Sequence, residues 1–343
     1  MKTIPIVLLG FGNVAQSLLQ LLEKNDRYEG EGVVVEVRAI FDRGGGIVVG
    51  SRKAGTLVDI KRREGSVTRV PGVDRLSVEE ALDSAGAGSI LVDTSVTDAS
   101  TGEPGLTPAR LALARGISVV FASKGPLVVA QSELVARARE KGVRLGASAA
   151  VGIPLPSIEV GVYGCRGARV HRFRGILNDT TNQILRDLEA GITLESSIER
   201  ARIAGTIEED PRLDLEGWDA AYKLLILARA LWEPGLSLSD AHTSGVEIVD
   251  AERLEEARRQ RQRLRLVASG ERDGAGGVLL ETSVQALDQD DPFYHLGPGH
   301  KAVVLETDVM GSLTVSSTRG GPLATAACVV KDVLNIASRP SPF

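Results

Sequence analysis

A lysine and an aspartate four residues apart are the side chains of this sequence best suited to move a proton. If Asp219 and Lys223 lie on a helix, their spacing places them on one face. That face continues through Ile226, Leu227 and Ala230, and its apolar character predicts that it points inward. A lysine at the edge of an apolar face, held by a carboxylate, can act in proton transfer. A surface salt bridge is the alternative that the spacing alone leaves open.

An acidic segment comes shortly before this pair. It contains Glu208, Glu209, Asp210 and Asp214. Carboxylates attract positive charge, so their number near Lys223 suits the binding of a cationic group such as a substrate ammonium. We therefore expect the segment 208–223 to contribute both binding and proton transfer.

A glycine-rich turn near the amino terminus could bind a phosphate group. It runs from Gly10 to Ala15, after a strand-like apolar run and before a helical one. Gly10 permits a tight turn, Gly12 lets the backbone approach a pyrophosphate, and the small Ala15 allows close helix–strand packing. The helix N-terminus then offers N–H groups to the anion. The pattern predicts a dinucleotide site, with a plain strand–turn–helix as the alternative.

Two further candidate positions follow predicted strands. Asp42 could accept hydrogen bonds from the adenosine ribose of NAD, whereas Arg43 could favour the 2′-phosphate of NADP, so the sequence leaves both cofactors open. Lys124 follows another strand at the edge where open α/β sheets bind ligands, although a loop lysine is the alternative. The segment after Asp42 also carries basic residues, which are either cofactor contacts or solvated charges: Lys53, Lys61 and Arg62.

The elements that must position these residues alternate between strands and helices in the first half of the chain. The pattern predicts strands at 3–9, 33–41, 89–93, 118–122 and 143–147. Between them it predicts helices at 14–23 and 132–141. A further helix is expected to follow the capping box at 77–80, and another to run from Thr107-Pro108 to 115. We interpret 43–66 as a loop or irregular excursion. This alternation is typical of a Rossmann-type, doubly wound parallel sheet in an α/β protein.

The second half has a different pattern. Helices are expected at 180–189, 193–204, 218–231 and 323–337, with Thr193 as a cap, and 208–216 is expected to be a loop. The arginines of 253–265 are mixed with glutamates, which favours a solvated face over a nucleic-acid patch. This half predicts a second domain of α+β type.

The composition excludes several functional classes. The chain has 343 residues, 43% hydrophobic, and a formal net charge of −5, which gives no field to attract nucleic acid or a membrane surface. Its two cysteines, Cys165 and Cys328, form neither a zinc motif nor a disulfide framework. With no signal peptide or membrane-spanning run expected, a reducing cytoplasm is the simplest setting.

Several of these segments together resemble homoserine dehydrogenase over nearly the whole chain. The resemblance is carried by the nucleotide loop at 11–14, the Ser-Lys-Gly-Pro at 123–126, and the Gly-Ile-Leu-Asn-Asp-Thr-Thr-Asn stretch at 175–182. It continues through the acidic segment and lysine at 205–223 and the Gly-Gly-Pro turn and helix at 320–326. The stretch at 175–182 is the most specific of these motifs.

The resemblance implies NAD(P)-dependent interconversion of L-homoserine and L-aspartate 4-semialdehyde, in the biosynthesis of threonine, methionine and isoleucine. It implies that Lys223 donates and accepts the proton, that Asp219 orients it, and that Lys124 lies between nicotinamide and substrate. It assigns substrate contacts to Glu208, Asp214, Gly175 and Thr180. The expected cofactor contacts are Gly10, Phe11, Gly12, Asn13, Val14, Asp42, Arg43, Thr94, Ser95, Ser123, Lys124 and Gly320.

The resemblance also implies a domain organisation. Residues 1–147 would bind the dinucleotide, 148–318 would bind substrate and form a homodimer, and 319–343 would return to the nucleotide domain. The regulatory domain of longer family members would be absent.

The sequence departs from the family pattern at three positions: Asp179 replaces a glycine, Arg319 replaces a small residue or proline, and Gly146 replaces a glutamate associated with a monovalent cation. The backbone carbonyls of Ala149 and Val151 remain candidate ligands for Na⁺. These departures leave open an alternative function, a nucleotide-binding sensor or inactive relative without turnover.

Overall fold

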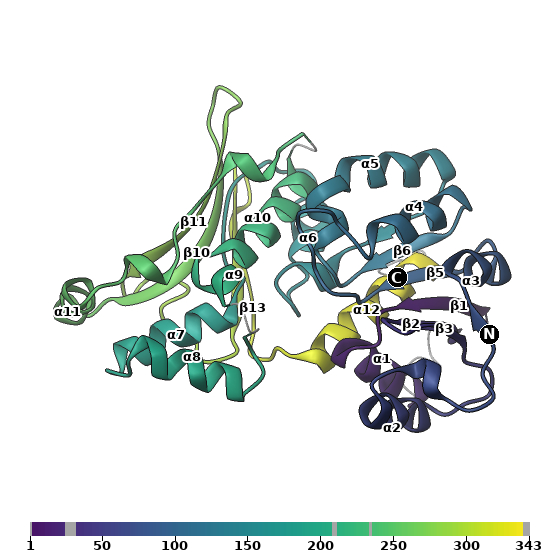
Figure 1. The fold of residues 1–343 in the computed structure, drawn as a ribbon. Coiled ribbons are helices and arrows are strands. Elements are labelled where there is room, and N and C mark those ends of the chain that lie inside the picture. Colours follow the sequence, from purple (N-terminus) through teal and green to yellow (C-terminus); the bar gives the residue numbers. More distant parts are fainter. Residues whose placement is uncertain (1, 25–31, 208–210, 233–234, 339–343) are drawn as a thin grey trace. The chain divides into compact units, whose positions relative to one another are not determined.

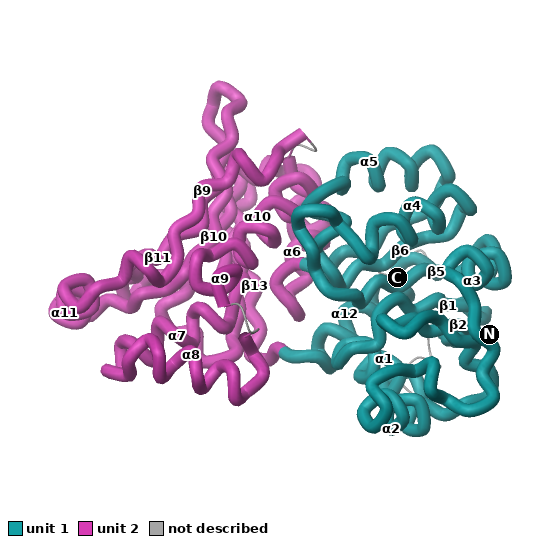
Figure 2. The backbone as a smooth tube through the Cα atoms, in the orientation of Figure 1, with its two compact units in different colours: residues 1–150, 321–343 teal, residues 151–320 magenta. Residues whose placement is uncertain are grey.

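The chain forms two compact units. The structure is a computed structural model that describes residues 2–24, 32–207, 211–232 and 235–338 (Figure 1). One unit comprises residues 1–150 and 321–343, and the other comprises 151–320 (Figure 2). The boundaries lie at 150/151 and 320/321, and the last helix belongs to the first unit.

The first unit is built on a seven-stranded sheet in the order β4-β3-β2-β1-β5-β6-β7. Strands β2, β1, β5, β6 and β7 run parallel, whereas β3 and β4 form an antiparallel edge. The chain passes from β1 to β2 on one side and later to β5 on the other, so the sheet is doubly wound. This arrangement confirms the predicted Rossmann-type class. The strands are β1 (Lys2–Leu9), β2 (Val33–Asp42), β3 (Gly45–Val48), β4 (Arg75–Leu76), β5 (Ile90–Asp93), β6 (Ser118–Phe121) and β7 (Leu145–Gly146).

Helices cover the sheet of the first unit and bury an aliphatic core against it. Helix α1 packs against α2 and α12, and α4 packs against α3 and α5 (Figure 1). Helix α3 begins with the predicted capping box, formed by Ser77 and Glu80. The helices are α1 (Asn13–Glu23), α2 (Ala54–Glu64), α3 (Val78–Ala85), α4 (Leu106–Ala114), α5 (Gly125–Lys141) and α12 (Pro322–Ala337), with 3-10 turns at Val67–Arg69 and Ser148–Ala150.

The structure corrects three local predictions in this unit. The segment 43–66 is not a loop, because it forms β3, which pairs with β2, and then α2. Helix α5 begins at Gly125, where Pro126 fits the first turn because its missing N–H is not needed, and it is kinked at the non-helical Ala130. The predicted helix 132–141 corresponds to the part after this kink, and the turn before it was not predicted. Helix α4 begins at Leu106, one residue before the predicted cap Thr107, with Gly105 as the capping residue.

The second unit contains a six-stranded mixed sheet in the order β13-β12-β8-β10-β11-β9. Its pairs are antiparallel except that β11 runs parallel to β9. Helix α7 packs on β10, and α10 packs on β10 and β11 (Figure 1). The second unit is thus of the expected α+β type. The strands are β8 (Val170–Ile176), β9 (Ala241–Thr243), β10 (Arg263–Arg272), β11 (Val278–Leu287), β12 (Lys301–Thr307) and β13 (Gly311–Ser317).

Two helices of the second unit match the predictions made from the sequence. Helix α10 has the predicted bounds, and Thr193 caps α8 as expected. The expected loop at 208–216 instead contains the short helix α9, because four residues after Pro211 form a helical turn. The helices are α6 (Ser157–Glu159), α7 (Asp179–Glu189), α8 (Leu194–Ile203), α9 (Arg212–Leu215), α10 (Trp218–Leu231) and α11 (Ala251–Arg259), with a π-helical turn at Val160–Gly164 and 3-10 turns at Leu238–Asp240 and Val246–Ile248.

None of the helices in the described ranges is long and apolar enough to cross a membrane.

Candidate active site

The lysine and aspartate that the sequence singled out contact each other on α10. The Lys223 Nζ donates a hydrogen bond to Asp219 Oδ2 at 2.5 Å and another to the backbone carbonyl of Leu177 at 2.9 Å. The Lys223 side chain is 13% exposed and that of Asp219 is 19% exposed. The pair is therefore a partly buried contact on a helix face that continues into the core, not a solvated surface bridge.

Asn178 joins this pair to a second carboxylate. Its Nδ2 donates to Asp219 Oδ2 and to Asp214 Oδ1, both at 2.7 Å. Its Oδ1 accepts from the Thr181 backbone N–H at 2.9 Å, so Asn178 is also the N-cap of α7. The cap fixes which end of the amide carries oxygen, so the NH₂ group must face the two carboxylates. The sequence placed Asn178 only within a motif and did not predict this junction.

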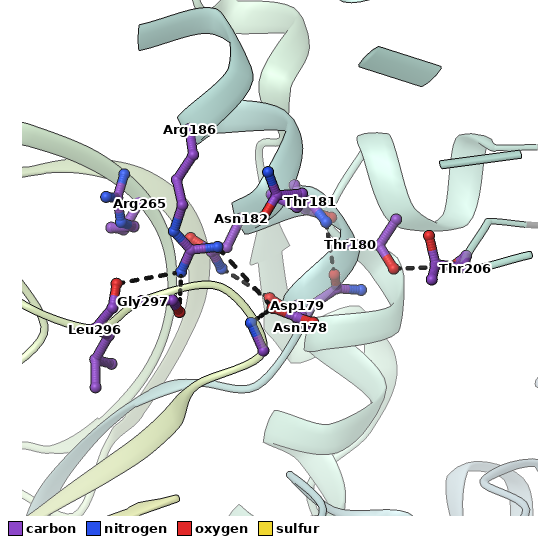
Figure 3. Close-up of polar contacts among 12 residues, drawn as sticks. Asn178, Asp179, Thr180, Thr181, Asn182, Arg186, Thr206, Arg265, Leu296 and Gly297 are labelled. Atoms are coloured by element: carbon purple, nitrogen blue, oxygen red, sulfur yellow. Dashed lines mark hydrogen bonds and ion pairs between the residues drawn. The ribbon is translucent and has the colours of Figure 1, made fainter. Parts of the chain in front are cut away.

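The start of α7 is held in place by side chains of the motif at 175–182 (Figure 3). The Thr181 hydroxyl donates to the Asp214 carbonyl at 2.7 Å. Asn182 exchanges hydrogen bonds with the backbone of Leu266 in β10, at 3.0 and 3.1 Å. The Thr180 hydroxyl donates to the Thr206 carbonyl at 2.9 Å. These bonds fix the turn between β8 and α7 that carries Asn178.

Asp179, the departure from the family pattern in this motif, faces a different group. Its Oδ1 accepts from the Gly299 backbone N–H at 3.0 Å and lies 4.0 Å from Arg186 Nη1 (Figure 3). Burial, with the nearby charge of Arg265, lowers the pKa of Arg186 to about 10. The Asp179 carboxylate therefore balances the positive charge of the buried Arg186 guanidinium. Its neighbour Thr180 instead donates a hydrogen bond to the Thr206 carbonyl.

Two further candidates, Gly175 for the substrate and Gly320 for the cofactor, lie in the described part of the second unit. Gly175 is buried near the end of β8, two residues before the Leu177 carbonyl that Lys223 contacts. Gly320 lies at the end of the second unit, where a Cβ would be 3.9 Å from Lys301 Nζ. Glu208 lies outside the described residues.

A close backbone contact holds α9, which carries Asp214, and the sequence did not point to it. A Cβ on Gly245 would be 1.7 Å from the carbonyl oxygen of Leu215, the last residue of α9. Any side chain at position 245 therefore displaces the end of α9, because a backbone carbonyl cannot rotate away as a flexible side chain can.

We expect Gly245→Ala to destabilise the second unit by about 2 kcal/mol, typical of an added methyl group in a packed site. It should also raise the KM for the substrate that the sequence resemblance implies, because Asp214, an expected substrate contact, moves with α9. Urea unfolding and initial rates measure the two effects. Gly274→Ala is the control, because no described atom lies within 4 Å of a Cβ there. Equal behaviour of the two variants would contradict the role of this contact.

In the first unit, three candidate segments meet at one edge of the sheet. Strands β1, β5 and β6 are parallel neighbours, so the residues after Leu9, Asp93 and Phe121 lie along the same edge. The Thr94 hydroxyl donates to the Gly10 carbonyl at 2.9 Å. Gly10 has φ +88°, and a Cβ there would be 2.7 Å from Thr94 O, so this turn requires glycine.

The N-terminus of α1 is open in the way that an anion site requires. Gly12 is its capping residue, and no described atom lies within 4 Å of the position that a Cβ would take there. The first turn carries no acidic residue, so its N–H groups and the positive end of the helix dipole can face a phosphate. Asn13 and Val14 begin this turn, whereas the Phe11 side chain is buried in the core.

Buried Asp93 organises the residues at the ends of β5 and β6. Ser123 Oγ donates to Asp93 Oδ2 at 2.5 Å, and the Ser95 backbone N–H donates to Oδ1 at 2.9 Å. Burial raises the pKa of Asp93, although these hydrogen bonds oppose the shift. Lys124 follows as the capping residue of α5, and its backbone N–H donates to Thr97 Oγ1 at 3.2 Å. The sequence predicted the serines and the lysine but not the carboxyl group that holds them.

Asp42 lies at the end of β2, as predicted, but its carboxylate is surrounded by protein donors. The side chain is only 3% exposed. Burial alone would raise the pKa of Asp42, but four hydrogen bonds outweigh it and hold the pKa below its usual value. The donors, each at 2.8 Å, are Gly44 N, Ser66 Oγ, Lys61 Nζ and Val67 N. Arg43, the next residue, is exposed.

The described residues contain no group of three or more His, Cys, Asp or Glu side chains that could hold a metal ion.

Comparison with known proteins places the chain in a family. The family model for homoserine dehydrogenase matches residues 156–334. The NAD(+)-dependent homoserine dehydrogenase of Pseudomonas canavaninivorans is 30% identical, over 96% of this chain and 95% of the relative. The homoserine dehydrogenase of Sulfurisphaera tokodaii is 29% identical, over 96% and 97% of the two chains.

Solved structures show the same fold along the whole chain. A putative homoserine dehydrogenase from Archaeoglobus fulgidus matches with a TM-score of 0.84 and 28% identity, over 98% of this chain and 99% of the other. A hyperthermophilic archaeal homoserine dehydrogenase in complex with NADPH matches with a TM-score of 0.82 and 26% identity, over 97% of each chain. The sequence resemblance is confirmed, and this chain belongs to the homoserine dehydrogenase family of NAD(P)-dependent oxidoreductases.

Proposed function

We propose that this protein interconverts L-homoserine and L-aspartate 4-semialdehyde, with Lys223 as the proton donor and acceptor. The observation that carries the proposal is the hydrogen-bonded group of Lys223, Asp219, Asn178 and Asp214. This reaction would serve the biosynthesis of threonine, methionine and isoleucine. The family resemblance further suggests that the protein acts as a homodimer.

The bonds of Lys223 support this role. A protonated lysine has three N–H donors, and the described residues occupy two of them, at Asp219 and Leu177. The third can reach a substrate oxygen. In the oxidation direction Lys223 takes the hydroxyl proton of homoserine, and in the reduction direction its ammonium returns a proton to the carbonyl oxygen.

The remaining groups of the site bind and orient. Asp219 holds the Lys223 side chain in one direction, and Asn178 holds Asp219. Asp214 and Glu208 would bind the substrate ammonium, with Gly175 and Thr180 alongside. In the first unit the open turn at Gly12 fits a dinucleotide pyrophosphate, with Thr94, Ser95 and Lys124 along the same edge. When bound, the nicotinamide supplies the hydride chemistry.

An assay with both cofactors tests the proposal. Purified protein should reduce NAD(P)⁺ with L-homoserine and oxidise NAD(P)H with L-aspartate 4-semialdehyde. A titration of NADPH binding is run beside it. Tight binding of the nucleotide with no rate in either direction would overturn the proposal and favour a nucleotide-binding protein without turnover.

We further propose that NADP(H) is preferred over NAD(H). The Asp42 carboxylate, which would accept the ribose hydroxyls of NAD, already accepts four protein hydrogen bonds, as many as its lone pairs allow. Arg43 is exposed beside it, and Lys61 Nζ uses two of its donors on Asp42 and Gly65. A 2′-phosphate would meet two cations here. A relative is named NAD(+)-dependent and a solved structure holds NADPH, so the family accommodates both cofactors.

Arg43→Ala should lower kcat/KM for NADP⁺ by about tenfold or more, since a charge-assisted hydrogen bond contributes about 1.5–3 kcal/mol. The value for NAD⁺ should remain unchanged. Arg63→Ala, an exposed arginine of α2, is the matched control. A wild type that prefers NAD⁺, or a variant that loses both cofactors equally, would contradict this preference.

A further inference from the structure

A buried carboxylate of the first unit lies beside Gly146, where the resembled family has a glutamate. Asp332 comes from α12 and is 4% exposed. A Cβ on Gly146 would be 2.7 Å from the Asp332 Cβ and 3.0 Å from its Oδ2. A side chain at position 146 and the present position of Asp332 therefore exclude each other. The glycine does not simply remove a carboxylate, because α12 supplies one to the same place.

The carboxylate is joined to an ammonium group through a serine. Ser148 donates to Asp332 twice, from its backbone N–H at 2.9 Å and from its hydroxyl at 2.5 Å. The Lys331 Nζ donates to the same hydroxyl at 2.9 Å and lies 3.8 Å from Asp332 Oδ1. A hydroxyl group has a single proton, so the Ser148 hydroxyl donates a hydrogen bond to the carboxylate and accepts a hydrogen bond from the ammonium. The three side chains form one directed chain of hydrogen bonds.

This arrangement does not fit a monovalent metal ion. Ser148 begins the 3-10 turn that contains Ala149, whose carbonyl is a candidate cation ligand. A cation in this group would require a carboxylate whose charge is not already balanced. Here the Lys331 ammonium contacts both oxygen-bearing side chains of the group, and a second cation beside it would be repelled.

We propose that the Lys331 ammonium takes the place of the monovalent cation in this protein. Neither folding nor turnover then depends on Na⁺ or K⁺. The inference rests on the proposed function only for the turnover measurement, because thermal unfolding of the protein reports on the charge group whether or not homoserine is the substrate.

The first test compares salts on the wild-type protein. Protein dialysed into choline chloride is measured for Tm and kcat in choline chloride, NaCl and KCl at one ionic strength. We expect equal Tm values and kcat values within about twofold, since exposed charges are screened alike at equal ionic strength. A Tm or kcat that rises with Na⁺ or K⁺ relative to choline would overturn the inference. A protein that binds no metal ion but lacks homoserine turnover would overturn only the proposed function.

The second test removes the ammonium. Lys331→Met should lower Tm in choline chloride by about 3 °C, within the range of about 2–4 °C that one lost interaction produces in a domain of this size. Na⁺ or K⁺ should recover part of this loss, and Lys331→Arg should keep the wild-type Tm. Lys141→Met, at an exposed lysine of α5 in the same unit, is the control. A Lys331→Met variant as stable as the control would overturn the inference. If Lys331→Met does not fold, the comparison of salts on the wild-type protein decides.

Discussion

Replacing Lys223 by alanine should lower kcat for homoserine oxidation by about 10³-fold, the middle of the range for loss of a general acid or base. The substrate hydroxyl then loses the proposed acceptor of its proton, and Asp219 loses the ammonium it contacts at 2.5 Å. Binding of NADP(H) should not change, because Lys223 is not among the predicted nucleotide contacts, which apart from Gly320 belong to the first unit. Stopped-flow or steady-state rates give kcat, and fluorescence titration gives the Kd for NADPH.

Lys223→Arg separates charge from proton transfer. Arginine keeps a positive charge near Asp219 but does not release a proton in the physiological range. It should therefore retain stability close to that of the wild type while kcat stays near that of Lys223→Ala. An arginine variant with wild-type kcat would show that Lys223 acts only through its charge.

The second large effect is expected at Asn178, where two substitutions preserve the cap of α7 but differ in charge. Asn178→Asp retains a capping oxygen for the Thr181 N–H, yet its other oxygen faces Asp214 and Asp219 at the 2.7 Å positions where Asn178 now donates. The mutual repulsion of three carboxylates should displace Asp219 from Lys223. We expect kcat/KM to fall by about 10- to 10²-fold, since losing partners of a charged group costs about 1.5–3 kcal/mol.

Asn178→Ser is the matched control for this prediction. Serine also caps a helix but is neutral and too short to reach both carboxylates. The activity of Asn178→Ser should lie between those of the wild type and Asn178→Asp. Aspartate has the closer shape to asparagine, so this order would show that charge rather than shape determines the effect. Circular dichroism should show similar folded states. An aspartate variant more active than the serine variant would contradict the assigned orientation of the amide.

Elements with a strong apolar period were predicted well from the sequence. Helix α10 was predicted with both of its ends, because the segment from Trp218 to Leu231 is strongly apolar, and its buried residues lie between Ala220 and Ala228. The i, i+4 relation of Asp219 and Lys223 followed from the predicted helix. The prediction did not extend to their third partner, because Asn178 lies 41 residues from Asp219 and only the turn after β8 brings it there.

The segment after β2 was misjudged for a physical reason. Its glycines and basic residues lack an apolar period, so the sequence favoured a loop. In the folded chain, β3 is ordered by pairing with β2, and Asp42 accepts bonds from residues as far as Val67. The composition of the segment does not reveal such contacts. The same applies to Gly146, whose meaning depends on Asp332 at the far end of the chain.

The substrate preference of the purified protein tests the central claim most directly. Initial rates with NADP⁺ are compared for L-homoserine, D-homoserine and L-serine, which differ in configuration or chain length at the same functional groups. The proposed site predicts that kcat/KM for L-homoserine exceeds the others by about 10²-fold or more, because a buried polar site rejects a substrate that leaves its groups unpaired. A faster rate with another of these alcohols, or no turnover of L-homoserine by a protein that binds NADPH, would contradict the account.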